Sequence, residues 1–118
     1  FMQALKDGKA PTINGDGEQT RDFTFVQNAV QANIRAFFAK EEAMNEVFNV
    51  AYVERISLNT LWESLQNISD KKIAAIYGPP RKGDVRDSLA NIDKARKLLD
   101  YDPLFSVKDG LKLTWEQF

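Results

Sequence analysis

The chain of 118 residues contains no cysteine and no histidine. These two absences exclude thiolate nucleophiles, disulfide bonds, imidazole bases and zinc sites of the usual kind. No apolar run approaches the roughly 18 residues of a membrane-spanning helix, so neither a membrane span nor a signal peptide is predicted. The absence of cysteine is compatible with a cytoplasmic protein, and the cytoplasm is the location that we expect.

The chain also lacks an excess of either charge, because it contains 16 lysines and arginines and 17 acidic residues, for a net charge of −1. The chain therefore has no broad basic field that would collect nucleic acid or anionic lipid, and we expect neither partner. Any anion site must be local and built from a few arginines. The length and the 43% hydrophobic content fit one domain with a modest core.

Short strands and helices alternate along the sequence, which favours an α/β fold. Helical apolar stripes fall within residues 1–5, 27–40, 58–68, 92–99 and 107–118. The first helix is expected to stop near Gly8, and caps are expected at Ser57, at Asn91 and in a capping box of Ser106 and Asp109. Strands are expected over residues 12–14, 23–26, 46–51, 72–77 and 85–89. The stripes carry several aromatic side chains, for which core packing is expected: Phe37, Phe38, Trp62 and Trp115.

Residues 15–23, GDGEQTRDF, are one residue short of the dinucleotide fingerprint GxGxxG. Thr20 stands at the third glycine position, and a strand is expected next, whereas pyrophosphate binding needs the start of a helix there. A calcium loop is excluded as well, because Gln19 stands where glycine is needed and Phe25 where glutamate is needed. Taken alone, the segment is an ordinary turn, in which Arg21 and Asp22 form a surface ion pair.

A second arginine cluster lies about 60 residues later, in GPPRKGDVR, residues 78–86. In this order the two segments resemble the motifs GDGxQTRDFxxV and RxGD of nucleotide-sugar epimerases and dehydratases, in the extended short-chain dehydrogenase/reductase family. Between them, EVFNVA and ISLNTLWE resemble a strand and the following helix of that family. The resemblance covers nearly the whole chain and is strongest to UDP-glucose and UDP-N-acetylglucosamine 4-epimerases.

The resemblance implies that residues 1–118 are the C-terminal substrate-binding part of such an enzyme. This part is a small mixed lobe of short strands and helices that lacks most of the Rossmann domain. NAD would be bound by an N-terminal portion that is missing here, and the chain indeed starts within an apolar helical pattern without an initiator methionine. The helix expected over residues 27–40 and the strand expected over residues 46–51 would pack mainly on that portion. We therefore expect an exposed apolar face that is covered by self-association into a homo-oligomer.

The resemblance also implies which residues bind the UDP-sugar. Arg21 and Arg81 would hold the diphosphate, a role that suits a guanidinium fork because it binds phosphate oxygens bidentately and stays charged. Asp84 would accept hydrogen bonds from the ribose hydroxyls, since an ionised carboxylate offers acceptors only. Asn14, together with Ile13, lies on the segment along which the uracil would bind, largely through backbone groups.

Two further positions are less specific. Arg86 either extends the phosphate site or pairs with its neighbour Asp87. Asn28 stands where many relatives carry an acidic residue, and the segment FVQNAVQAN resembles instead epimerases that act on UDP-N-acetylglucosamine and its uronic acid.

The residues of the family's hydride chemistry are absent. None of the three tyrosines is followed by lysine at the fourth position, so no Tyr-x-x-x-Lys pair exists, and no catalytic residue is predicted. The implied parent enzyme oxidises C4 of the sugar with NAD, rotates the 4-keto intermediate and returns the hydride to the other face. Residues 1–118 would anchor the nucleotide during these steps and would be inactive alone. Two alternatives stay open: the same lobe of a nucleotide-sugar dehydratase, decarboxylase or reductase, and a free-standing binding module without catalysis.

Overall fold

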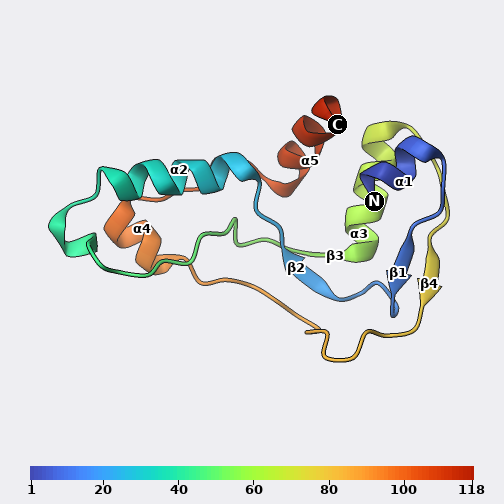
Figure 1. The fold of residues 1–118 in the computed structure, drawn as a ribbon, viewed down its shortest axis with the longest axis horizontal. Helices are drawn as coiled ribbons and strands as arrows, with labels where there is room; N and C mark the ends of the chain where they lie inside the picture. Colours follow the sequence, from blue (N-terminus) through green and yellow to red (C-terminus); the bar gives the residue numbers. More distant parts are fainter.

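The computed structural model describes all residues from 1 to 118 (Figure 1). It is a small mixed fold of helices and three-residue strands, as the sequence predicts. The elements follow in the order α1 (Met2–Asp7), β1 (Thr12–Asn14), β2 (Thr20–Asp22), α2 (Val26–Phe37), the 3-10 helix η1 (Glu41–Ala43), β3 (Arg55–Ser57), α3 (Leu58–Ser69), β4 (Ile76–Gly78), α4 (Asp93–Leu99) and α5 (Val107–Gln117).

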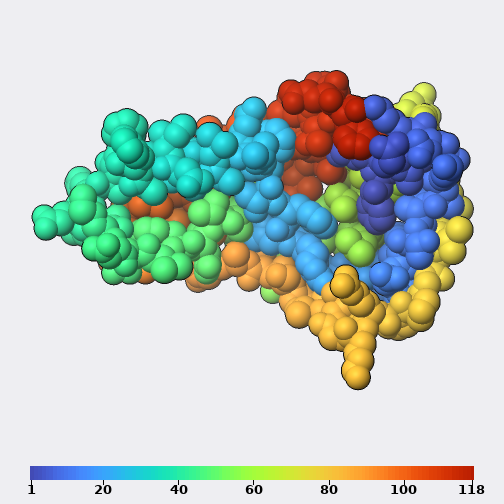
Figure 2. Space-filling model, viewed as in Figure 1, coloured from blue at the N-terminus to red at the C-terminus, as the bar shows by residue number.

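The molecule is elongated and has two ends (Figures 1 and 2). At one end α1 and α3 lie near the parallel pair β1–β4 and α5 packs against α3, and at the other end α2 lies beside α4 and α4 beside η1. The antiparallel pair β2–β3 joins them. The radius of gyration is 16.7 Å, whereas a compact domain of this length has about 13.5 Å. The chain therefore buries less of itself than a compact domain does.

Each end has its own small core. Leu5, Ile13, Trp62 and Leu65 form the core beside β1. The core of the other end consists of Ala32, Ala43, Ala51, Ile92, Ala95, Leu99 and Tyr101. There the phenol of Tyr101 is fully buried and donates a hydrogen bond to the Ala51 carbonyl at 3.0 Å. Two clusters of this size position the loops between them but leave a large surface uncovered.

The Asp22 side chain in β2 connects two distant chain segments in the middle of the molecule. One carboxylate oxygen accepts from the backbone N–H of Val53 at 3.1 Å, and the other accepts from the N–H of Ala90 at 3.3 Å. The alternative interpretation of Arg21 and Asp22 as a surface ion pair is therefore wrong, because this carboxylate accepts from backbone groups and Arg21 pairs with Asp84 instead.

The helix boundaries agree with the local signals. The Ser57 hydroxyl accepts from the Thr60 N–H at 3.1 Å, and Ser106 forms the expected capping box with Asp109. Helix α1 ends at Gly8, whose φ of 66° is the left-handed conformation that glycine adopts easily. The cap predicted at Asn91 is wrong by one position, because Ile92 is the N-cap of α4; the Asn91 side-chain oxygen accepts from the N–H of Asp93 at 2.8 Å.

The strand predictions are less accurate. Residues 46–51 and 85–89 form no strand, because no neighbouring strand pairs with their backbone groups. The strand expected at residues 23–26 lies earlier, at Thr20–Asp22, and Phe25 instead precedes the first turn of α2. The strand expected at 72–77 is confined to Ile76–Gly78.

The aromatic predictions divide between the two ends. Trp62 is buried as expected, whereas Phe37 and Phe38 are 82% and 78% exposed, so core packing is wrong for them. With Val30 and Ile34, which are at least half exposed, they form the apolar face of α2. The exposed apolar face that the sequence predicts is thus confirmed. None of the helices is long and apolar enough to cross a membrane.

Candidate functional site

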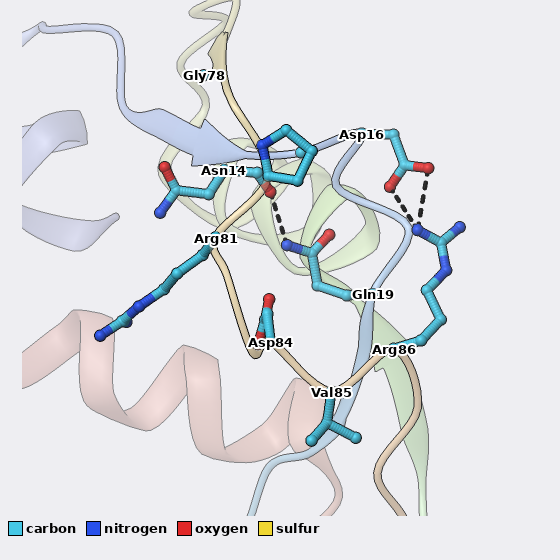
Figure 3. A pocket seen from close by; sticks show the side chains of 10 residues that line it. Asn14, Asp16, Gln19, Gly78, Arg81, Asp84, Val85 and Arg86 are labelled. Atoms are coloured by element: carbon cyan, nitrogen blue, oxygen red, sulfur yellow. Dashed lines mark hydrogen bonds and ion pairs between the residues drawn. The ribbon is translucent and has the colours of Figure 1, made fainter.

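A cleft of about 510 Å³ lies between the turn that follows β1 and the loop that follows β4 (Figure 3). Only one of its ten lining residues is hydrophobic. The lining consists of Asn14, Gly15, Asp16, Gln19, Gly78, Pro80, Arg81, Asp84, Val85 and Arg86. In Figure 2 the loop around residue 80, in gold, projects at the lower edge of the molecule.

The parallel pairing of β1 with β4 creates this cleft. Asn14 is in register with Gly78, and the Gly15 N–H donates to the Gly78 carbonyl at 3.0 Å, so both strands end at the same place. Beyond that point the two chain segments separate. Gly15 and Gly17 have φ values of 76° and 77°, which side-chain-bearing residues rarely adopt, and they turn the chain back toward β2.

The second loop is held against β2 by hydrogen bonds. The Thr20 N–H donates to the Arg86 carbonyl at 2.9 Å, and the Thr20 hydroxyl donates to the Asp87 carboxylate at 2.8 Å. Next to them, the Arg21 guanidinium is bonded to the Asp84 carboxylate. These contacts join segments about 65 residues apart in sequence, which local patterns do not reveal.

Arg86 crosses the cleft to Asp16. One guanidinium nitrogen donates to both carboxylate oxygens, at 2.8 and 3.0 Å (Figure 3). Arg86 thus pairs with Asp16 rather than with Asp87. The hydrogen bond from Arg86, with a second from the Glu18 N–H, holds the pKa of Asp16 below its ordinary value, and Asp16 in turn raises the pKa of Arg86. Both groups are therefore charged at neutral pH.

Arg81 is the unpaired cation of the cleft. Its side chain extends away from Asp16 and Arg86 and has no ion-pair partner (Figure 3). With Arg21 counted beside Asp84, three guanidinium groups face two carboxylates, which leaves one excess positive charge. Because a guanidinium without a carboxylate keeps all its N–H donors, this end of the cleft suits an anion with several oxygens.

Asn14 and Gln19 form the polar floor beside β1. Strand β1 pairs only with β4, so its other edge carries no strand. The Asn14 carbonyl already accepts from the Gln19 amide at 2.7 Å. Gln19 is 93% buried, its exposed fraction being 7%, and its amide oxygen has no hydrogen-bond partner.

The structure brings the predicted site residues together, although not all in the expected way. Asn14, Arg81, Asp84 and Arg86 line the cleft, and Arg21 contacts it through Asp84.

Two polar side chains of the lining, those of Asp16 and Gln19, are not among the residues that the sequence predicts for the site. They lie within the segment that also carries Arg21, but a turn residue alone does not reveal its long-range partner.

Asn28 lies outside the lining of the cleft. It is fully buried, and its amide donates to the Phe105 carbonyl at 2.8 Å while its oxygen accepts from the N–H groups of Leu104 and Phe105. The asparagine is therefore explained by the loop before α5, and no contact connects it with the choice of sugar.

The residues present do not fit a dinucleotide. The Gly15–Gly17 turn leads into strand β2 and not into a helix, and β3 passes directly into α3 without any glycine between them. The required arrangement of a strand, a glycine turn and a helix N-terminus is thus absent from these residues.

Comparisons with known proteins place the chain in a family. Residues 1–114 match the family model described as GDP-mannose 4,6 dehydratase. The chain belongs to this nucleotide-sugar epimerase and dehydratase family. It is 33% identical over 115 residues to a UDP-glucuronate 4-epimerase of Thermodesulfobacterium geofontis, an alignment that covers 97% of this chain and 35% of the relative.

Solved structures of the epimerase/dehydratase family confirm the fold. The chain matches UDP-glucose 4-epimerase of Thermotoga maritima, solved with UDP-glucose, with a TM-score of 0.90 and 37% identity over 98% of this chain and 36% of that one. It matches UDP-glucuronic acid 4-epimerase of Bacillus cereus, solved with UDP-glucuronic acid and NAD, with a TM-score of 0.91 and 31% identity over 98% and 37%. The chain spans about a third of the length of these relatives.

Proposed function

We propose that these 118 residues form the substrate-binding part of a NAD-dependent UDP-sugar 4-epimerase and that the cleft anchors the UDP diphosphate. The observation that carries the proposal is the meeting of Arg21, Arg81 and Arg86 from two distant loops at one polar cleft. The 4-epimerases among the similar proteins support the reaction class. The substrate is a UDP-hexose or UDP-N-acetylhexosamine of the glucose type.

In this proposal Arg81 meets the diphosphate first, since its guanidinium is unpaired. Arg21 is held by Asp84 and by a 2.6 Å hydrogen bond to the Thr20 carbonyl, so its guanidinium is oriented before any ligand arrives. Asp84 keeps free acceptor positions, because a carboxylate has about four lone-pair sites, and it accepts from the ribose hydroxyls. The nucleotide is fixed and the sugar stays free to turn.

Residues outside this chain would bind NAD and exchange the hydride with the sugar. This division follows from the absence of a dinucleotide turn and of a Tyr-x-x-x-Lys pair among the 118 residues. On its own, the chain is expected to bind nucleotide without catalysing epimerisation.

The reaction is tested on the longer protein that carries this chain. It is incubated separately with UDP-glucose, UDP-N-acetylglucosamine and UDP-glucuronic acid, and the products are identified by proton NMR. Inversion at C4 is expected for at least one of them. A product that has lost water or carbon dioxide would instead assign the chain to a dehydratase or decarboxylase. Failure to turn over or bind any UDP-sugar would leave a non-catalytic module.

A further inference from the structure

The first turn of α3 also connects the two chain segments that line the cleft. The contacts described above join the loop after β4 to β2. Asn59, the half-buried second residue of α3, lies between the turn after β1 and strand β4. It does not line the cleft.

Asn59 holds the turn through three hydrogen bonds. Its backbone N–H donates to the Gly17 carbonyl at 3.0 Å. Its side-chain amide donates to the Asp16 carbonyl at 3.0 Å and to the Glu18 carboxylate at 2.5 Å. Both donors of the amide nitrogen are thus used by residues of one turn.

The oxygen of the same amide serves the other segment. It accepts from the Tyr77 hydroxyl at 2.9 Å, and Tyr77 lies in β4, immediately before Gly78 of the cleft. Because the Asp16 carbonyl and the Glu18 carboxylate accept only, they fix the nitrogen of the amide on their side and the oxygen on the side of Tyr77. One side chain therefore contacts both segments.

The space around Asn59 is filled. A Cβ atom added to Gly17 would lie 2.0 Å from the Asn59 amide oxygen, a distance that real Cβ atoms do not show. Since Gly17 also has a φ of 77°, a side chain at this position would be strained and would displace the Asn59 amide. The turn is held to α3 by close packing as well as by hydrogen bonds.

We infer that Asn59 is a positioning residue of the nucleotide site, which fixes the turn of residues 15–19 and the start of the Arg81 loop relative to each other. The inference rests on the proposed function, because the two segments carry the groups assigned to the UDP diphosphate and uracil. Asn59 touches no ligand. It acts by fixing the distance between the two segments. A small change in that distance would move Arg81 away from the other groups that are proposed to bind the diphosphate.

The test is the Asn59→Asp variant of the longer protein, with Asn67→Asp on the same helix as the matched control. Asn59→Asp keeps the shape and the acceptor for Tyr77, but it loses both amide donors and places a second carboxylate beside that of Glu18, which also drives the turn away from α3. An acidic residue in the first turn of a helix is favourable, so α3 itself is not weakened. Asn67 is exposed, and its side-chain oxygen only accepts from Lys72, a contact that the carboxylate of the control variant retains.

Calorimetry with UDP and steady-state kinetics are the readouts. For Asn59→Asp we expect about tenfold weaker UDP affinity, from the loss of two hydrogen bonds, and a raised KM with nearly unchanged kcat. The control should match the wild type in both. A merely structural defect would instead lower the fraction of active protein, so the apparent kcat would fall while KM stayed unchanged.

A second variant pair keeps the inference falsifiable. If Asn59 links the segments, Tyr77→Phe should weaken UDP binding in the wild type and add nothing in an Asn59→Ala background, because both changes break one contact. Additive losses, or wild-type affinity and KM in Asn59→Asp, would overturn the inference while UDP binding by the wild type upholds the proposed function. A wild type that binds no UDP would overturn both.

Discussion

Replacing Phe37 and Phe38 with serine removes the most exposed part of the apolar face of α2. These rings are 82% and 78% exposed and contact each other edge to face at a centroid distance of 5.0 Å. Burying a phenylalanine side chain completely stabilises by about 1.5–3 kcal/mol. Covering four-fifths of both rings in each of two copies therefore contributes about 5–10 kcal/mol in gross terms.

That contribution decides whether the 118-residue chain associates. It is comparable to the cost of bringing two molecules together, which is about 4–15 kcal/mol. The half-exposed Val30 and Ile34 add to it. We therefore expect the wild-type chain to form dimers or larger species as its concentration is raised, as predicted from the sequence, and the double serine variant to stay monomeric at concentrations where the wild-type chain associates.

Sedimentation velocity over a range of concentrations is the assay, with Leu104→Ser as the control. Leu104 is 70% exposed but lies outside α2, so its substitution removes apolar surface without touching this face. The control should associate like the wild type. A wild-type chain that is monomeric at every concentration would refute the reasoning, as would a double variant that associates equally.

Three further changes test individual contacts. Carboxyl NMR should show that the pKa of Asp16 lies below its ordinary value of 3.8, so the ion pair with Arg86 is lost only as the pH falls through that lowered pKa. In the Arg86→Gln variant the pKa of Asp16 should return toward 3.8. Equal pKa values of Asp16 in the wild type and the variant would exclude the pairing. Tyr101→Phe should lower the free energy of unfolding in urea by about 1–3 kcal/mol, because the buried Ala51 carbonyl loses its donor, and an unchanged midpoint would count against that bond. Asn28→Asp should destabilise by a similar 1–3 kcal/mol without changing UDP affinity, because it loses the amide donor to the loop before α5; weaker UDP binding at unchanged stability would instead favour a role in the site.

The parts of the fold that local chemistry determines were predictable from the sequence. Ser57, and Ser106 with Asp109, satisfy backbone groups within three residues of themselves, so their sequence spacing is sufficient to identify the caps. The apolar stripe of α2 was equally visible in the sequence. Whether that stripe is covered depends on surfaces outside the helix, so the stripe alone does not determine whether Phe37 and Phe38 are exposed or packed in a core.

Long-range pairing is what the local patterns missed. Strand β1 pairs with β4 across more than 60 residues, and residues 46–51 have strand-forming side chains but no strand beside them. The same holds for the site. The motifs indicated Arg21 and Arg81, whereas the partners Asp84 for Arg21 and Asp16 for Arg86 depend on how the two loops fold against each other.

The central claim, that this cleft binds the diphosphate of a UDP-sugar, is tested most directly by calorimetry with UDP on the longer protein. Arg81→Ala is compared with Lys82→Ala, the neighbouring cation that does not line the cleft. We expect Arg81→Ala to weaken UDP binding by about 1.5–3 kcal/mol, the range for hydrogen bonds to a charged group, and Arg21→Ala to do the same. Lys82→Ala should leave the affinity unchanged. Equal affinities of the wild type and all three variants would contradict the account.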